Sequence, residues 1–447
     1  MTHLAKMRSL FVILFAFVLV TLPAVKPDIS SAAQSNVKIV YAGRLIDGTS
    51  NNARTNVSII IERDRIREVR SGRATIEGAE VIDLSDATVI PGLIDCHTHM
   101  TMQLGPGEQY ASLVRRDTDR AITATVYARR TLMAGFTTVR DVGAGGFIDI
   151  SLRDAINAGT IAGPRMFVAT KTLSITGGHG DVGGIREDLL PEPDYKEGIV
   201  NTPEDGVRAV RYEVKYGADH IKICATGGVL SIADSGSGQQ FTYEEMKAIV
   251  DAARLLDRKV AAHAHGVEGM KDAIRAGVAS IEHGTYLDDE AITLFKKHGT
   301  YLVPTIIAGK TVENAAKIPG FFPPPIQEKA RTIGPLMQAS FAKAYRGGVK
   351  IAFGTDAGVF PHGQNAKEME YMVEAGMPAI ETILAATRNA ADLIGRSNEI
   401  GSIQSGRYAD LVAVKGDPAA DIKLLQNVSF VMKAGQVYKR DGKPVTQ

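Results

Sequence analysis

The sequence predicts an α/β protein: a closed (β/α)₈ barrel of the TIM type with a small β-sandwich built from both ends of the chain. Three observations support this prediction. Short β-branched runs separated by turn residues occupy the beginning of the chain and recur at its far end. Between them, short apolar runs alternate with longer amphipathic stretches. This middle part spans roughly 310 residues, which is room for up to eight such units.

The β-rich ends account for the predicted small domain. Strands are expected near the start at residues 37–41, 57–61, 65–69 and 80–84, and near the end at residues 410–414 and 428–432. Glycines follow several of these runs, as expected for tight turns between strands. The pattern assigns residues 34–89 and 401–447 to one β-sandwich domain.

The middle of the chain, residues 90–400, is assigned to the barrel. Strands are expected at residues 137–142, 218–225, 259–265, 280–283, 301–306 and 350–354. Helices are expected between them, for example at residues 243–256 and 267–276. Strands that alternate with helices indicate a parallel sheet. An open doubly wound sheet is the alternative, but no GxGxxG motif opens a first strand–helix turn.

The first residues have the features of a targeting segment. Lys6 and Arg8 precede an almost uninterrupted apolar run over residues 9–25, and small residues follow it. We expect a signal peptide over residues 1–33 and an exported protein, periplasmic or secreted. An uncleaved membrane anchor is the alternative, but the run is short and Pro23 interrupts it.

The charge of the chain argues against nucleic acid as a partner, and the positions of its cysteines argue against a disulfide. The chain has 51 basic and 50 acidic residues and no Lys/Arg-rich run, so nucleic acid is not an expected partner. No membrane association is expected once the signal peptide is removed. The two cysteines, Cys96 and Cys224, fall on predicted strands with opposite side-chain parity. They are therefore expected to be buried free thiols, not a disulfide.

The sharpest chemical signal is the pair His97 and His99 at the end of an apolar run. Residues two apart on a strand face the same side, so both imidazoles would point into the barrel. This arrangement suits two ligands of one metal ion.

Lys222 lies inside an apolar strand, where a free cation is costly to bury. Two interpretations remain open from the residues alone. The amine is paired with a carboxylate elsewhere in the chain, or it has reacted with CO₂ to form a carbamate. A carbamate is anionic and can bridge two cations.

The remaining candidate ligands also follow apolar runs. They are His263, His265, His283 and Asp356. Singly, each is also compatible with a satisfied polar side chain or a helix cap. Together they fall at the carboxyl ends of predicted strands, where barrel enzymes place their active sites.

Six motifs carry a family resemblance, in this order: PGLIDCHTH, TTVRDVG, IKICATGG, HAHG, IEHG and GTDAG. The chain resembles the amidohydrolase superfamily over nearly its whole mature length. Within it, the sequence is similar to the branch of dipeptidases and N-acyl-amino-acid hydrolases, which includes prolidase-like and ochratoxin-hydrolysing enzymes. The resemblance implies a zinc-dependent hydrolase of amide or peptide bonds.

The resemblance also implies roles for individual residues. Two Zn²⁺ ions are expected, bridged by N6-carboxylysine at Lys222 and held by His97, His99, His263, His283 and Asp356. Asp356 is also expected to move the catalytic proton. His265 is expected to act near the substrate and to assist catalysis, although His263 and His265 could exchange roles. His179 is expected to contact substrate.

The expected substrate is a small-molecule dipeptide or N-acyl amino acid that loses its C-terminal amino acid. Ochratoxin A, cleaved to ochratoxin alpha and phenylalanine, is one candidate. Residues 240–243, Tyr286 and 321–325 are expected to line the pocket, and Arg140 to pair with Asp141 beneath it. The branch also implies a homo-oligomer, with an octamer as one form.

Two other functions remain as alternatives. A one-metal deaminase or cyclic-amide hydrolase of the same superfamily would carry a Glu soon after the fifth-strand His and no bridging lysine. Here Gly266 follows His265, and Lys222 is present. The second alternative is a non-catalytic exported metal-binding protein.

Overall fold

A computed structural model describes residues 37–105, 108, 111–189, 192–232 and 235–445. The chain divides into residues 1–35 and residues 36–447, and all described residues belong to the second unit. The predicted signal peptide lies outside the described residues. None of the helices in the described ranges is both long and apolar enough to cross a bilayer.

Both ends of the described chain meet in one eight-stranded sheet, in the order β17-β16-β15-β14-β4-β1-β2-β3. Its strands are β1 (Val37–Leu45), β2 (Arg54–Glu62), β3 (Arg65–Ser71), β4 (Glu80–Pro91), β14 (Leu411–Lys415), β15 (Phe430–Lys433), β16 (Gln436–Arg440) and β17 (Lys443–Pro444). The two ends join where β14 pairs antiparallel with β4, with Val412 opposite Ile90. A cluster of buried apolar side chains lies against this sheet and includes Leu45, Ile59 and Phe430. This sheet is compatible with a small β-domain built from both ends of the chain, as the sequence predicts.

The middle of the chain forms two parallel sheets. One has three strands in the order β5 (Leu93–Thr98), β6 (Phe136–Asp141) and β7 (Arg165–Val168). The other has six in the order β13-β12-β11-β10-β9-β8, comprising β8 (Thr172–Leu173), β9 (Ile221–Cys224), β10 (Val260–Ala264), β11 (Ser280–His283), β12 (Tyr301–Val303) and β13 (Lys350–Ile351). All of these neighbours pair in parallel, as the alternation of strands and helices predicts.

Backbone hydrogen bonds connect the three-stranded sheet to the six-stranded sheet along both of its edges. The Cys96 amide of β5 donates to the Phe353 carbonyl at 2.9 Å, and the Asp356 amide donates to the His97 carbonyl at 2.8 Å. On the other side, the Asp219 amide before β9 donates to the Val168 carbonyl of β7 at 2.8 Å. The strand predicted over residues 350–354 is shorter in the structure, where β13 comprises Lys350–Ile351; beyond it, the Ala352 amide still donates to the Leu302 carbonyl of β12, and the Phe353 carbonyl accepts from β5.

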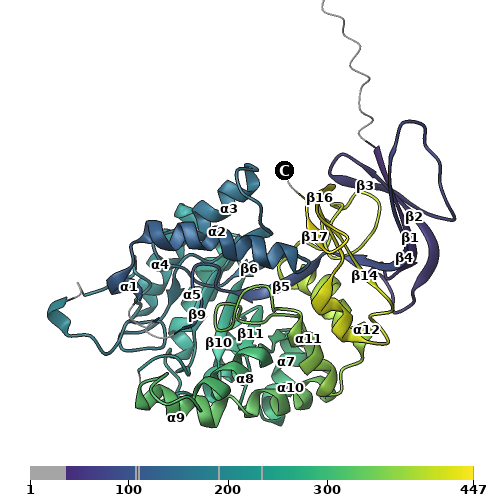
Figure 1. Ribbon diagram of the computed structural model, residues 1–447. Coiled ribbons are helices and arrows are strands. Elements are labelled where there is room, and N and C mark those ends of the chain that lie inside the picture. Colours follow the sequence, from purple (N-terminus) through teal and green to yellow (C-terminus); the bar gives the residue numbers. More distant parts are fainter. Residues whose placement is uncertain (1–36, 106–107, 109–110, 190–191, 233–234, 446–447) are drawn as a thin grey trace, which may run out of the picture. The chain divides into compact units, whose positions relative to one another are not determined.

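Helices follow most of these strands and lie outside them in Figure 1. The α-helices are α1 (Ala111–Val114), α2 (Asp117–Met133), α3 (Ile148–Asn157), α4 (Pro203–Tyr216), α5 (Tyr243–Leu255), α6 (Val267–Ala276), α7 (Asp289–His298), α8 (Ile306–Ala315), α9 (Pro324–Ile333), α10 (Leu336–Arg346), α11 (Lys367–Glu374), α12 (Ala379–Leu384) and α13 (Ala390–Leu393). Short helical turns lie at η2 (Glu187–Leu189), η3 (Ala385–Asn389) and η4 (Ile422–Asn427).

Local sequence explains several helix boundaries. At the start of α5, the Thr242 hydroxyl accepts from the Glu245 amide, and the Glu245 carboxylate accepts from the Thr242 amide. This reciprocal capping box satisfies two amides that the first turn cannot bond internally. At the end of α6, Gly277 adopts a left-handed conformation with φ of 103°, which ends the helix. The predicted helices over 243–256 and 267–276 agree with α5 and α6 to within one residue.

Aromatic side chains pack inside the parallel sheets on the side away from the candidate ligands. Phe136, at the start of β6, stacks on Phe353 with ring centroids 5.6 Å apart, and both side chains are fully buried. The Phe353 carbonyl also accepts a hydrogen bond from the Cys96 amide. The stacked Phe136 and Phe353 rings therefore support the junction between β5 and the edge of the six-stranded sheet.

We predict that Phe136→Ala lowers the free energy of unfolding by about 3–5 kcal/mol, because it removes a buried ring and leaves a cavity. Urea unfolding followed by circular dichroism measures the loss. Phe321→Ala, at a partly exposed ring, is the control and should cost much less. Equal losses in the two variants would contradict the role assigned to the Phe136–Phe353 pair.

Candidate metal centre

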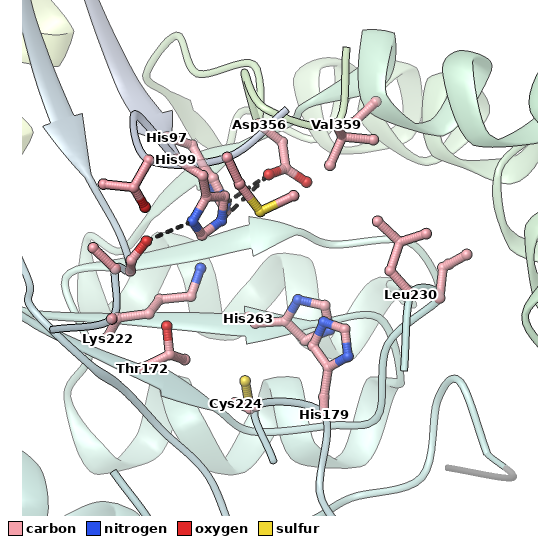
Figure 2. Close-up of a pocket in the computed structure, with 18 of the residues that line it drawn as sticks. His97, His99, Thr172, His179, Lys222, Cys224, Leu230, His263, Asp356 and Val359 are labelled. Atoms are coloured by element: carbon pink, nitrogen blue, oxygen red, sulfur yellow. Dashed lines mark hydrogen bonds and ion pairs between the residues drawn. The ribbon is translucent and has the colours of Figure 1, made fainter. Parts of the chain in front are cut away.

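A cavity of about 600 Å³ opens at the carboxyl ends of the parallel strands. Its lining brings together every candidate ligand that the sequence singles out: His97, His99, His179, Lys222, His263, His265, His283 and Asp356. These residues come from the ends of β5, β9, β10 and β11 and from the loops that follow β8 and β13. Figure 2 shows several of them converging on the same space.

One group of potential ligands consists of His97, His99 and Asp356, whose ligating atoms lie within 4.8 Å of one another. The Nε2 atoms of both histidines are 3.5 Å from the same oxygen, Oδ1 of Asp356. That distance is too long for a hydrogen bond, and Oδ1 is buried with no donor in the described part of the chain. Buried polar atoms are usually paired, so this convergence fits a divalent cation between the three groups.

Hydrogen bonds behind the two imidazoles fix their orientation. His97 Nδ1 donates to Glu282 Oε2 at 2.8 Å, and His99 Nδ1 donates to the Gly143 carbonyl at 3.0 Å. A carboxylate or a carbonyl can only accept, so in both rings the lone pair is left on Nε2, the atom that faces Asp356. Such partners set the tautomer of metal-binding histidines and increase their basicity.

Glu282 was not among the residues predicted for the site. It also accepts from Arg140 at 2.8 Å, and Arg140 donates to the Cys96 carbonyl at 2.6 Å. The predicted pairing of Arg140 with Asp141 is therefore wrong: the adjacent side chains of a strand point to opposite faces, and Asp141 accepts the Met100 amide instead.

The second group consists of His263, His265 and His283, whose ligating atoms also lie within 4.8 Å of one another. His263 Nε2 donates to the Gly227 carbonyl at 3.0 Å, which leaves its lone pair on Nδ1. The Nδ1 atoms of His265 and His283 lie 2.7 Å from threonine hydroxyls, those of Thr285 and Thr305. In each of the three rings, therefore, one nitrogen has a hydrogen-bond partner and the other is available to bind a metal ion or a substrate.

His283 and Asp356 reach the cavity through an uncommon backbone conformation. Their φ angles are 73° and 63°, in the left-handed region that side chains other than glycine rarely adopt. In β11, Glu282 already faces the interior of the parallel sheets, where it contacts His97 and Arg140, so regular alternation would turn His283 away from that side. The positive φ of His283 brings its side chain back to that side, where it lines the cavity. Conformations of this kind cost free energy and concentrate at functional sites.

Lys222 extends from β9 into the cavity that both groups line, and Figure 2 shows its amine pointing toward His97 and His99. Its residue is only 3% exposed, and burial lowers the pKa of its amine while Glu282 and Asp356 oppose that shift. A lowered pKa increases the fraction of neutral amine, the form that is nucleophilic toward CO₂. The position and environment of Lys222 are compatible with a carbamate bridge.

Burial sets the protonation of the imidazoles. It lowers the pKa of His99 to about 4 and that of His265 to about 3, and it holds the pKa of His97, His263 and His283 well below the ordinary value. All five rings are neutral at pH 7, which is the form that binds metal. Burial has the opposite effect on Asp356, whose pKa is raised to about 7.

A buried carboxylate, Asp95, ties the Asp356 loop to β5. It accepts from the Thr355 hydroxyl at 2.6 Å, from the Asn365 amide group at 2.7 Å and from the His97 amide at 3.1 Å. Asp95 contacts both Thr355, the residue before Asp356, and the backbone of His97. It therefore fixes the position of Asp356 relative to His97 in the first ligand group. Sequence reasoning did not identify this role.

His179 lies beside the second group, with its ring centroid 4.4 Å from that of His263. Its backbone amide donates to Gln240 Oε1 at 3.0 Å, and its Nδ1 is buried without a hydrogen-bond partner in the described residues. Gly228 permits this position, because a Cβ there would lie 2.3 Å from the imidazole. His179 therefore presents an unpaired polar atom in the cavity wall.

The rest of the cavity has an apolar wall and a charged rim. The apolar side chains are Met102, Val182, Val229, Leu230, Ala308, Val312, Met337 and Val359, and the charged ones are Asp117, Arg120, Lys171 and Glu197. The lining predicted from sequence is wrong here: residues 240–243, Tyr286 and 321–325 are not among the lining residues. Phe321 and Phe322 instead pack behind the wall, against a cluster that includes Val312.

The two cysteines do not form a disulfide. Both are free and buried, as their strand parity predicts. Cys224 lines the cavity, whereas Cys96 packs on the other side of β5 in a cluster with Ala390 and Leu393.

Comparisons with known proteins identify the family. Residues 88–438 match the amidohydrolase family. Ochratoxinase from Aspergillus niger is 34% identical over 444 residues, covering 93% of this chain and 89% of the relative. The crystal structure of a Xaa-Pro dipeptidase with methionine bound in its active site is 49% identical, has a TM-score of 0.88 and covers 90% of this chain and 100% of its own. A prolidase complexed with N-methylphosphonate-L-proline is 31% identical with a TM-score of 0.84, over 90% and 100% of the two chains.

The chain belongs to the amidohydrolase family, in the branch that includes ochratoxinase and prolidases. It is a hydrolase that acts on amide bonds.

The lowered pKa of His265 predicts a specific pH dependence of stability. Below its ordinary pKa of 6.5, this histidine binds a proton in the unfolded chain but not in the metal-free folded protein. The stability that it contributes is therefore lost as the pH falls from 7 to 5. Asparagine does not titrate, so His265→Asn does not suffer this loss. The free energy of unfolding of His265→Asn should therefore rise by about 2 kcal/mol relative to that of wild type as the pH falls from 7 to 5.

Urea unfolding of the chelator-treated proteins at pH 7 and pH 5 measures this difference. His298→Asn, at an exposed histidine, is the control. If His265→Asn and His298→Asn behave alike, His265 is not held neutral by burial.

Proposed function

We propose that this protein is a two-metal amide hydrolase that releases the C-terminal residue of a dipeptide or an N-acyl amino acid. One observation carries the proposal: two groups of ligating side chains line one cavity, which Lys222 also lines. A single-metal hydrolase would need only one such group.

The two groups divide the metal ligands between them. His97, His99 and Asp356 would hold one Zn²⁺ ion and His263 and His283 the other, with a carbamate on Lys222 bridging both. The unpaired Oδ1 of Asp356 and the neutral state of the imidazoles support this assignment. When bound, the two ions supply an activated water, whose pKa falls to about 7, and polarise the scissile carbonyl.

The side chains of this protein then move the proton and position the substrate. Asp356, with a buried carboxylate of raised pKa, accepts a proton from the attacking water and donates it to the departing amine. His265 has Nδ1 against Thr285, so its other ring nitrogen remains to stabilise the oxyanion or hold a substrate carboxylate. His179, beside His263, is assigned to substrate contact.

We propose that the parallel strands form one closed (β/α)₈ barrel. In this interpretation β7 and β8 are parts of one interrupted strand, and the hydrogen bonds from Cys96 and Asp356 close the ring. The barrel then comprises residues 90–400, and the β-sandwich comprises residues 34–89 and 401–447. Residues 1–33 are proposed to be a signal peptide that directs export, and the exported chain to assemble as a homo-oligomer.

The shape of the cavity supports an amino acid derivative as the substrate. Its apolar wall can bury an aliphatic or aromatic side chain, and Arg120 and Lys171 at its rim can attract a carboxylate. The related structures carry methionine or a proline derivative, and the related Aspergillus niger protein is an ochratoxinase. These relatives support dipeptides, N-acyl amino acids and ochratoxin A as the first substrates to test.

We predict that the purified protein contains about two metal ions per chain and hydrolyses members of a panel of dipeptides and N-acyl amino acids. Metal analysis and detection of the released amino acid measure the two properties. About one ion per chain with ring-opening or deaminating activity would support the one-metal alternative. Bound metal with no hydrolysis of any amide would support a binding protein.

The carbamate is tested by Lys222→Ala. We predict the loss of most bound metal and of activity, because no group remains to bridge the two ligand sets. Short carboxylic acids such as acetate or propionate should restore part of both, since they can take the place of the carbamate. Lys350→Ala, at an exposed lysine of β13, is the control. Full activity in Lys222→Ala would exclude the bridge.

A further inference from the structure

A second cavity, of about 320 Å³, lies at the opposite ends of the parallel strands. Its lining includes His220, directly before β9, and Lys259, directly before β10. The first cavity is built instead from residues at the carboxyl ends of the strands. The two cavities have no described lining residue in common.

Positive charge exceeds negative charge in the lining of this second cavity. Four cationic side chains, Arg140, Arg258, Lys259 and Arg396, face two acidic ones, Asp219 and Asp257. Three of these charges have partners outside the lining: Arg140 is paired with Glu282 at 2.8 Å, Arg396 with Glu399 at 3.2 Å and Asp219 with Arg153 at 2.9 Å. The remaining charges are those of Arg258 and Lys259 against that of Asp257, an excess of one positive charge.

The cavity has a buried floor and an open rim. Arg140 is only 3% exposed and lies at the floor, while Lys259 and Arg396 are exposed at the rim. Cations at the rim attract anions from solvent, and a buried guanidinium binds oxygen atoms more strongly than an exposed one.

His220 gives an independent indication of a ligand. It is 5% exposed, and neither of its ring nitrogens has a hydrogen-bond partner in the described residues. A neutral imidazole has one N–H donor and one acceptor, and burying both without partners is costly. The side chain lines the cavity, so whatever occupies that space can supply the missing partner.

We propose that this second cavity is a binding site for a small oxoanion, either an inorganic phosphate or a short dicarboxylate. Arg140 already donates to Glu282, Ser280 and the Cys96 carbonyl, and Lys259 to the carbonyls of Asp392 and Leu393. The N–H groups that these bonds leave free would donate to the oxygens of the anion, together with those of Arg396 and His220. Planar guanidinium groups match phosphate and carboxylate oxygens in geometry as well as in charge. This proposal does not depend on the metal centre.

Isothermal titration calorimetry of the full-length metal-loaded protein tests the site, with inorganic phosphate and succinate as separate probes at constant ionic strength. We expect saturable binding of at least one probe with one site per chain, and the tighter probe identifies the class of anion. Arg396→Gln and His220→Phe should each weaken binding at least about tenfold. Arg254→Gln, at an exposed arginine outside the cavity, is the control and should bind as wild type does.

Two results would overturn the proposal. The absence of saturable binding of either probe means that the cavity holds only water. Binding that survives both Arg396→Gln and His220→Phe but is lost in Asp356→Asn means that the anion occupies the first cavity. If His220→Phe fails to fold, the exposed position of Arg396 keeps the test valid. Arg140 is not substituted, because it also holds Glu282 against His97.

Discussion

The removal of imidazoles, an amine and a carboxylate from water into one cavity is the constraint on which the rest of the site depends. Burial disfavours every charged form, so the histidines are neutral, the pKa of Lys222 is lowered and the pKa of Asp356 is raised. Such an arrangement leaves lone pairs and an unpaired carboxylate oxygen pointing at each other. Divalent cations would compensate for this lost hydration.

Residues behind the ligands hold this unfavourable arrangement in place. Glu282 orients His97, Arg140 neutralises Glu282, and Asp95 fixes the loop that carries Asp356. Each is a buried charge or carboxylate with several hydrogen bonds, which is the condition under which such groups are tolerated. The positive φ angles of His283 and Asp356 are a further cost of convergence on one point. The surrounding parallel sheets are rigid enough to keep these two residues in their strained backbone conformation.

Much of the architecture could be predicted from periodicity. Helices α5 and α6 have continuous amphipathic patterns and clear capping residues, and their observed ends agree with the prediction. The strands around His97 and Lys222 were found because alternation places ligands and apolar residues on opposite faces. Family resemblance supplied the expectation that histidines from separate strands share metal ions.

Other features were beyond reach because they depend on tertiary contacts or local backbone. Nothing in the sequence around Glu282 shows that it faces His97. Its neighbour His283 lines the cavity, and points to the same side of β11 as Glu282 only through its positive φ. The pairing of Arg140 with Asp141 was inferred from adjacency, which ignores the alternation of a strand. The apolar wall combines Met102, Val229, Val312 and Val359 from loops and helices far apart in the chain, so no local pattern marks it.

X-ray diffraction at the zinc absorption edge, from crystals grown without chelators, tests the central claim most directly. The account predicts two anomalous peaks in the first cavity. One should lie between His97, His99 and Asp356, and the other beside His263 and His283. Electron density extending from Lys222 Nζ should connect them. A single peak, or an unmodified Lys222 amine that contacts neither ion, would contradict the two-metal centre.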